Sequence, residues 1–110
     1  MAVSEGLVAL STLGVNHDAE GIARALVERG LAACVNVVPG VTSVYRWQGA
    51  VEREQEQLLV IKTTRERFEE LRRALLELHP YEVPELVALA VEAGHPPYLA
   101  WLDASCSRPG

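Results

Sequence analysis

Apolar and polar residues at the start of the chain are arranged in a pattern that predicts a strand followed by a helix. Residues 7–13 are mostly apolar, and the turn-forming Gly14 and Asn16 follow them. Asn16 or Asp18 is a suitable N-cap for the helix. Apolar residues then recur at helical spacing until Gly30, at Ile22, Ala23, Leu26 and Val27.

The next segment predicts one long bent strand that returns as a hairpin. Residues 32–38 are rich in β-branched side chains, Pro39-Gly40 interrupts them, and residues 41–47 resume the extended pattern. Because proline donates no ladder hydrogen bond, the interruption predicts a β-bulge. The turn Gln48-Gly49 then reverses the chain into a strand over residues 50–63.

The third part of the chain predicts a second helix and a fourth strand. Thr63 and Glu66 have the spacing of a capping box, so the helix is expected to begin at residue 63 or 64. The proline after His79 ends it, because proline disfavours a helical conformation in the preceding residue. Residues 85–91 are expected to form the strand. The apolar stripe of the helix consists of Phe68, Leu71, Leu75 and Leu78.

The predicted order is β-α-β-β-α-β, followed by an amphipathic helix over residues 98–104 and a frayed tail over residues 105–110. We interpret residues 1–110 as a single domain with its core in about residues 7–104. The order is that of the ferredoxin-like α+β fold, in which two helices cover one face of an antiparallel sheet. Residues 34–38 are largely apolar on both faces, so we expect an oligomer that buries the open face.

Composition and charge narrow the range of partners. Ten basic and fifteen acidic residues give a net charge of −5, which disfavours nucleic acids and anionic membrane surfaces. The longest apolar run, residues 58–61, is too short to span a bilayer. Residues 1–5 lack the cationic start and apolar stretch of a secretory signal, so we expect a cytoplasmic protein.

Residues that could carry chemistry are scattered along the chain. No nucleotide-binding or nucleophile motif is present, so an enzyme has no sequence support. Cys34 lies within a predicted strand and is expected to be a small buried hydrophobe, and Cys106 an exposed thiol. The possible metal ligands are ungrouped in sequence: Met1, His17, Cys34, His79, His95 and Cys106.

Three further features leave alternatives open. The proline-stiffened segment after the second helix is either a rigid connector or a functional loop, and it carries His79, Tyr81, Glu82 and Glu85. Tyr45 and Trp47 share one strand face and indicate interface packing or a binding platform, while Lys62 is expected to be a solvated strand-end lysine. Glutamates at alternate positions are expected to form a solvated face, with weak attraction for cations: Glu52, Glu54 and Glu56.

Five ordered motifs resemble the CutA family of divalent-cation tolerance proteins. They are residues 31–40 (LAACVNVVPG), 43–49 (SVYRWQG), 61–63 (IKT), 78–85 (LHPYEVPE) and 98–102 (YLAWL). The resemblance runs from about residue 7 to residue 102. It implies a ferredoxin-like subunit in a homotrimer whose long hairpins pack on neighbouring subunits. The segment Gly94-His95-Pro96-Pro97 departs from the family pattern, which more often has Asn after the glycine.

The resemblance also implies functions for named residues. The family is associated with tolerance of copper and other divalent ions, which implies a copper or other divalent-cation site at Cys34 and His79, with no organic cofactor. Such a protein would be a binding protein rather than an enzyme. The alternative is a signalling module similar to PII proteins, with a small-molecule cleft between subunits lined by Tyr45, Trp47, Lys62, His79, Tyr81 and Glu85.

Overall fold

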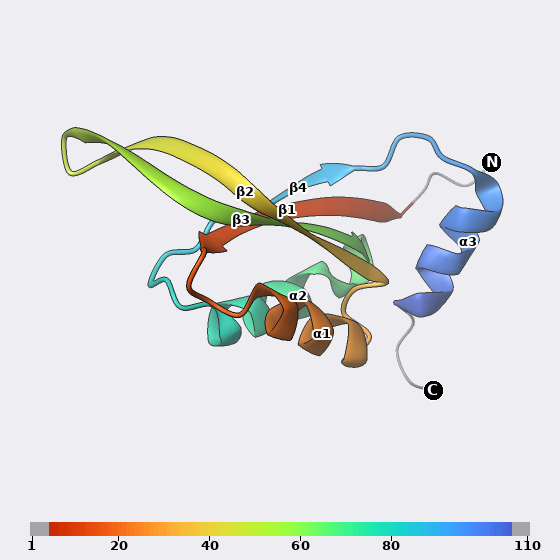
Figure 1. The fold of residues 1–110 in the computed structure, drawn as a ribbon. Helices are drawn as coiled ribbons and strands as arrows, with labels where there is room; N and C mark the ends of the chain where they lie inside the picture. Colours follow the sequence, from red (N-terminus) through yellow and green to blue (C-terminus); the bar gives the residue numbers. More distant parts are fainter. Residues whose placement is uncertain (1–4, 107–110) are drawn as a thin grey trace.

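The computed structural model describes residues 5–106, which form one four-stranded antiparallel sheet and three helices. The elements are β1 (Gly6–Gly14), α1 (Ala19–Glu28), β2 (Cys34–Trp47), β3 (Ala50–Thr64), α2 (Arg65–Leu78), β4 (Val87–Ala90) and α3 (Pro96–Ser105). The strand order is β2-β3-β1-β4, so β2 and β4 are the edge strands. Figure 1 shows α1 and α2 side by side beneath the sheet and α3 beyond its end. The predicted α+β class and order of elements are confirmed.

The core lies between the sheet and the two helices beneath it. Alternate residues of β1 point toward the helices, and Leu7, Ala9 and Leu13 are buried there. Ala9 and Leu13 pack with buried residues of β3 and the two helices, namely Leu59, Ile61, Leu26, Leu71 and Leu75. The intervening side chains of β1 and β3 face the opposite side of the sheet, which no helix covers (Figure 1).

The hairpin of β2 and β3 projects far beyond the rest of the sheet (Figure 1). Its register shifts between Val38 and Val41, which confirms the bulge predicted at Pro39-Gly40. The turn at its tip contains two residues in the left-handed region, Gln48 with φ 49° and Gly49 with φ 83°. This pair of positive φ angles is typical of the tight hairpin turns whose twist matches that of the flanking strands.

The N-cap predicted for α1 is correct, whereas the capping box predicted for α2 is not. Asp18 caps α1, because its Oδ1 accepts a hydrogen bond from the Gly21 amide at 2.9 Å. The capping box at Thr63 is wrong. Thr64 is the N-cap of α2 and makes no side-chain cap bond. The Thr63 hydroxyl instead donates to the Leu31 carbonyl at 2.7 Å in the buried interior.

The C-terminal part of the described chain differs from expectation in two ways. The α3 helix is not the amphipathic helix predicted, because Leu102 is its one buried residue and Tyr98 and Trp101 are 42% and 47% exposed. Cys106 is buried against Ala33 and Leu102, so the expectation of an exposed thiol is wrong. Ser105 ends α3, and the rest of the expected frayed tail (107–110) lies outside the described residues, as does Met1.

Candidate functional site

The connection between α2 and β4, residues 79–86, is called the 79–86 loop, and His79 joins it to β1. The His79 ring is buried, and its Nε2 lies 2.8 Å from the Thr12 carbonyl oxygen. Its Nδ1 accepts a hydrogen bond from the Tyr81 amide at 3.1 Å. A carbonyl partner requires a proton on Nε2, and an amide partner requires a lone pair on Nδ1. The ring is therefore the neutral Nε2–H tautomer, and burial lowers the pKa of His79.

Tyr81 extends this network to β3. Its hydroxyl donates to Glu56 Oε2 at 2.7 Å, and its ring meets the His79 ring edge-on at 4.7 Å between centroids. Burial and the bond to Glu56 raise the pKa of the Tyr81 hydroxyl. Glu56 is only 5% exposed, so its expected solvated position is wrong. Gly14 lies opposite Glu56, and a Cβ at Gly14 would meet the Tyr81 hydroxyl at 3.5 Å.

The far end of the 79–86 loop is also fixed to β1. The hydroxyl of Ser11, which is fully buried, donates to the Glu85 carbonyl at 2.7 Å. The Glu85 residue itself is exposed. Both ends of the loop are thus hydrogen-bonded to adjacent residues of β1, so the loop is fixed against the sheet.

Cys34 lies in a different place, on the open face of the sheet. It is the first residue of β2 and is half-buried, not fully buried as expected. Lys62 is its cross-strand partner. The Cys34 thiol lies 4.0 Å from Asn36 Oδ1, and the same oxygen accepts a hydrogen bond from the Lys62 ammonium. The three side chains form a small polar group within an otherwise apolar surface.

The predicted metal ligands do not meet within one chain. On β3, Lys62 pairs with Cys34 of β2. Leu58 of the same strand pairs with Thr12 of β1, whose carbonyl oxygen is hydrogen-bonded to His79. These two positions of β3 are four residues apart, which is about 13 Å along a strand. Among residues 5–106, no three His, Cys, Asp or Glu side chains are close enough to hold a metal ion.

The predicted cleft residues also fall into separate groups. Tyr45 lies near the hairpin tip, where its hydroxyl donates to Glu54 Oε1 at 2.7 Å and this bond raises the pKa of Tyr45 to about 12. Trp47, next to the turn, is 58% exposed. Glu52, the partner of Tyr45, is ten residues from Lys62 on β3, or about 33 Å. Only His79, Tyr81 and Glu85 lie together, in the 79–86 loop.

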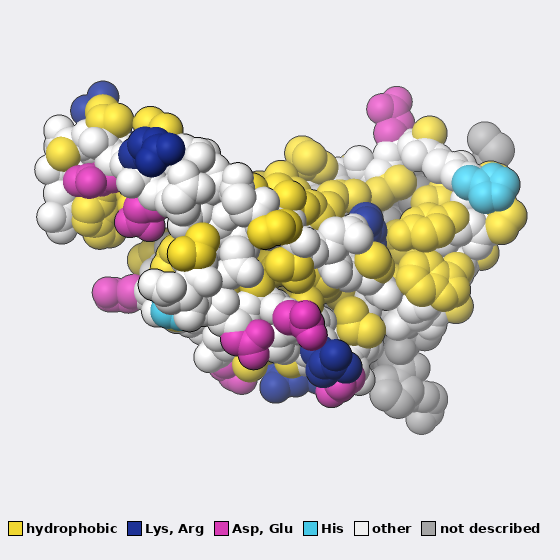
Figure 2. Space-filling model, in the orientation of Figure 1, with side chains coloured by type: hydrophobic (Ala, Val, Ile, Leu, Met, Phe, Trp, Pro, Cys, Tyr) yellow, Lys and Arg dark blue, Asp and Glu magenta, His cyan; other side chains and the backbone are white. Residues whose placement is uncertain are grey.

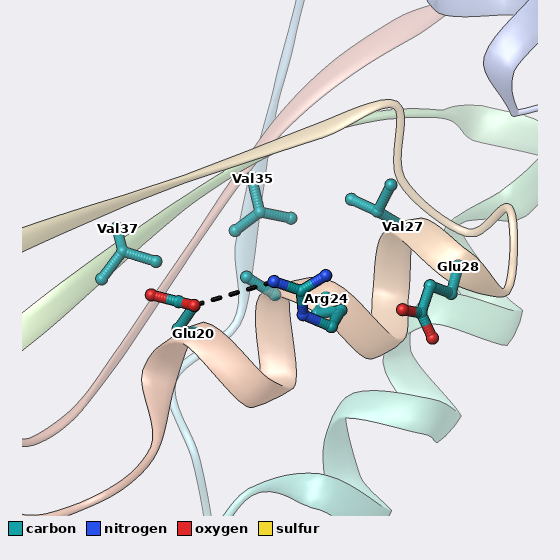
Figure 3. A pocket seen from close by; sticks show the side chains of 7 residues that line it. Glu20, Arg24, Val27, Glu28, Val35 and Val37 are labelled. Carbon is teal, nitrogen blue, oxygen red and sulfur yellow. Dashed lines mark ion pairs between the residues drawn. The ribbon is translucent and has the colours of Figure 1, made fainter.

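A groove along the outer edge of β2 is a feature that the sequence patterns missed. It has a volume of about 320 Å³ and lies between β2 and α1. Figure 3 shows Val35 and Val37 on one side of it and Glu20 and Arg24, an exposed ion pair, on the other. Helical spacing along α1 could have indicated a charged stripe, but the position of that stripe beside an edge strand depends on the sheet order.

Hydrophobic side chains gather on the uncovered side of the molecule. Figure 2 shows them spread over the middle of the sheet and over α3. They include Val38 of β2, Val87 and Leu89 of β4, and the aromatic pair of α3, whose rings are 5.4 Å apart. Leu89 is 60% exposed. A contiguous apolar surface of this kind marks an interaction site.

Comparison with known proteins places the chain in a family. The family model described as CutA1 divalent ion tolerance protein matches residues 7–105. A divalent-cation tolerance protein CutA from Thermus thermophilus is 54% identical over 95 residues, which are 86% of this chain and 92% of that protein. A Xenopus laevis CutA homolog is 51% identical over 84 residues, 76% of this chain but 56% of that protein.

Solved structures agree with this result. The Thermus thermophilus divalent cation tolerance protein superposes with a TM-score of 0.90 at 50% identity, over 93% of this chain and 99% of that one. A protein described as PII-like protein CutA, from Nostoc, superposes with a TM-score of 0.84 at 39% identity, over 92% and 97%. No helix within residues 5–106 is long and apolar enough to cross a membrane. The chain belongs to the CutA1 family of divalent ion tolerance proteins.

Proposed function

We propose that this chain acts in the cytoplasm as a homotrimer of ferredoxin-like subunits that binds copper or another divalent cation, with Cys34 as a ligand. The observation that carries the proposal is the half-buried thiol of Cys34 on the uncovered apolar face of the sheet. Membership of a divalent ion tolerance family supports the cation, and the apolar face supports the assembly.

The assembly follows from what a single chain leaves exposed. One face of the sheet lacks helices, and the edge strands β2 and β4 flank it. Apolar side chains of both edge strands, including Val38 and Leu89, are exposed in one chain. Burial of such a surface contributes about 25 cal/mol per Å² of apolar area, so association of copies is favourable.

Among residues 5–106, Cys34 is a soft ligand that the single chain leaves accessible. Cys106 is buried, and both ring nitrogens of His79 already have backbone partners, so the metal proposal does not use His79. Thiolates select Cu(I) and other soft ions. One thiol does not complete a coordination shell, and the remaining ligands come from neighbouring subunits in this proposal.

Copper uptake by matched cysteine variants tests the proposal. Equilibrium dialysis against Cu(I), followed by measurement of copper per chain, should show saturable binding by the wild-type assembly. Cys34→Ser should lose that binding, whereas Cys106→Ser should retain it, because Cys106 is buried. Equal binding by both variants would reject Cys34 as the ligand.

A second candidate is a PII-like module that binds a small molecule between subunits. The description of the Nostoc neighbour as PII-like favours it, and the separation of Tyr45, Lys62 and the 79–86 loop means that a site using all of them needs more than one chain. A thermal-shift screen of metabolites and nucleotides tests it, since a ligand of the folded state raises the Tm with occupancy. No shift at millimolar ligand would reject it.

We propose binding rather than catalysis for the same residues. The His79 ring nitrogens are both engaged with backbone groups, so the ring does not offer a lone pair to a substrate proton. Turnover that disappears in His79→Ala, while the assembly stays intact, would contradict this assignment.

A further inference from the structure

The outer part of the β2–β3 hairpin, residues 41–55, is called the arm. β1 ends at Gly14, which pairs with Glu56 of β3. Nearer the tip, residues 50–55 of β3 pair with β2 and with no other described strand. Figure 1 shows the arm projecting beyond the sheet as a two-stranded ribbon. Such a ribbon is at most marginally stable in water by itself, so contacts at its root decide how firmly it is held.

Two consecutive residues of β3 are held at this root. The Tyr81 hydroxyl of the 79–86 loop donates to Glu56 Oε2 at 2.7 Å. Gln57 Nε2 donates to two carbonyl oxygens, those of Gly14 at the end of β1 and His17 in the connection to α1, both at 3.0 Å. Adjacent residues of a strand point to opposite faces, so the strand is held from both sides. These three hydrogen bonds are called the root clamp.

The partners of the root clamp belong to fixed parts of the molecule. Both ends of the 79–86 loop are hydrogen-bonded to β1, through His79 and Ser11. Glu56 is 5% exposed, so water does not readily take the place of the Tyr81 hydroxyl. The root clamp thus ties the direction of the arm to the body of the subunit.

The arm carries apolar side chains on both of its faces. Val44 and Val51 lie on one face, Tyr45 and Trp47 lie on the other, and all four are exposed. A two-stranded ribbon does not cover both of its own faces. Exposed apolar side chains gathered in this way mark an interaction site.

The charges along β3 favour a second copy of the chain as the partner. Glu52 of the arm and Lys62 point to the open face of the sheet, but they are about 33 Å apart along the strand and do not meet within one chain. The Lys62 ammonium is half-buried and donates to the neutral Asn36. Covering the open face takes this charge out of water, which is costly unless a carboxylate pairs with it. The arm of a neighbouring copy offers Glu52 together with apolar side chains.

We propose that Tyr81 and Gln57 are positioning residues, which fix the direction of the arm so that it docks, already formed, on the open face of a neighbouring copy. The inference rests on the homotrimer proposed above. An arm that is fixed before association loses less conformational freedom when it docks. Breaking the root clamp therefore weakens assembly more than it weakens the fold of each subunit.

Light scattering on diluted samples of matched variants tests the effect on assembly. Tyr81→Phe removes one hydroxyl and should raise the concentration of half-dissociation about tenfold, the factor typical of one lost hydrogen bond to a buried polar group. Glu56→Gln keeps an acceptor for that hydroxyl and should dissociate like the wild type. Ser11→Ala removes a bond of the same length, 2.7 Å, at the other end of the loop. It should lower the Tm without changing the half-dissociation concentration.

Two outcomes of the dilution series would overturn the proposal. The first is a Tyr81→Phe protein that assembles like the wild type. The second is an equal weakening of assembly by Ser11→Ala, because the effect would then come from general loss of stability.

Residual dipolar couplings of backbone amides test the root clamp without assembly. Leu89→Glu places a carboxylate on the open face and should separate the subunits. In this monomer, the amides of the arm and of the core residue Ile61 should fit one common alignment. Adding Tyr81→Phe and Gln57→Leu should shrink the couplings of the arm and leave that of Ile61 unchanged.

The same measurements separate failure of the clamp from failure of the homotrimer. An arm whose couplings are already averaged in Leu89→Glu, or that keeps them after the clamp is removed, contradicts the clamp. A Leu89→Glu protein that stays trimeric contradicts docking on the open face. A wild-type monomer with a fixed arm would reject the homotrimer, and with it the docking of the arm.

Discussion

Among single residues, Arg67 and Arg72 make the same type of ion pair in different surroundings. Arg67 is 5% exposed, and its guanidinium donates to the Gly30 carbonyl at 3.3 Å and to Glu70 at 3.0 Å. Arg72 makes the same i,i+3 type of pair with Glu69, but both side chains are exposed to solvent. Arg67 therefore joins α2 to the turn after α1, whereas Arg72 forms its ion pair on the solvent-exposed surface of α2.

We expect Arg67→Ala to lower the free energy of unfolding by about 2 kcal/mol, because the variant loses buried side-chain packing and leaves the Gly30 carbonyl unpaired. The control, Arg72→Ala, should cost much less, since exposed pairs contribute little. Urea denaturation at one protein concentration measures both. Equal losses would show that the buried position of Arg67 has no energetic consequence.

Residue environments were the least predictable part of the chain. The buried position of Glu56 depends on Tyr81, 25 residues away, and the burial of Cys106 depends on Ala33 and Leu102. Neither relationship leaves a periodic pattern in the sequence. Residues 79–85 could be recognised as unusual from the prolines within the segment itself. The hydrogen bond between His79 and Thr12 could not be predicted, because the fold alone brings these two residues together.

At the scale of elements, local chemistry decided most helix and strand boundaries. Asp18 was a predictable cap because its partner, the Gly21 amide, is three residues away. Thr63 was not, because a carbonyl 32 residues away, that of Leu31, competes for its hydroxyl. A sequence pattern cannot express this competition, which explains why the capping box was wrong although the helix start was nearly right.

The hairpin turn offers an element-scale prediction. Gln48 has φ 49°, a region that costs most side chains free energy and that asparagine tolerates better. Gln48→Asn should therefore stabilise the fold by about 0.5 kcal/mol, and Gly49→Ala at φ 83° should destabilise it by about 1 kcal/mol. Thermal unfolding at fixed concentration checks both shifts. A lower Tm for Gln48→Asn would show that strain at the turn is not the controlling factor.

For the molecule as a whole, the sequence was sufficient to predict the order of the elements and the sheet face that no helix covers. The order was predictable because each strand and helix has its own local period, and residues 34–38 carry apolar side chains on both faces. The groove at the β2 edge was not predictable, because it exists only where the sheet order leaves β2 at an edge beside α1. Assembly and ligand positions depend on surfaces that one chain leaves open.

A charge on that open face tests whether it is an assembly surface. Leu89 is 60% exposed on β4, on the side of the sheet without helices. In the proposed homotrimer, Leu89→Glu should shift the mass from that of a trimer to that of a monomer, because a carboxylate in an apolar interface loses its hydration. Light scattering after size-exclusion chromatography measures the mass. Val15→Glu, which changes an exposed valine in the β1–α1 connection, should leave the trimer intact.

Native mass spectrometry of untagged protein, titrated with Cu(I), Cu(II) and Zn(II), counts the subunits and the bound metal ions of the assembly together. A homotrimer that binds copper through Cys34 should appear as a trimer that takes up a fixed, saturable number of copper ions. A monomer would contradict the role of the apolar face. A trimer that stays free of metal, or that loads ions without a plateau, would contradict cation binding through Cys34 and favour the cleft between subunits.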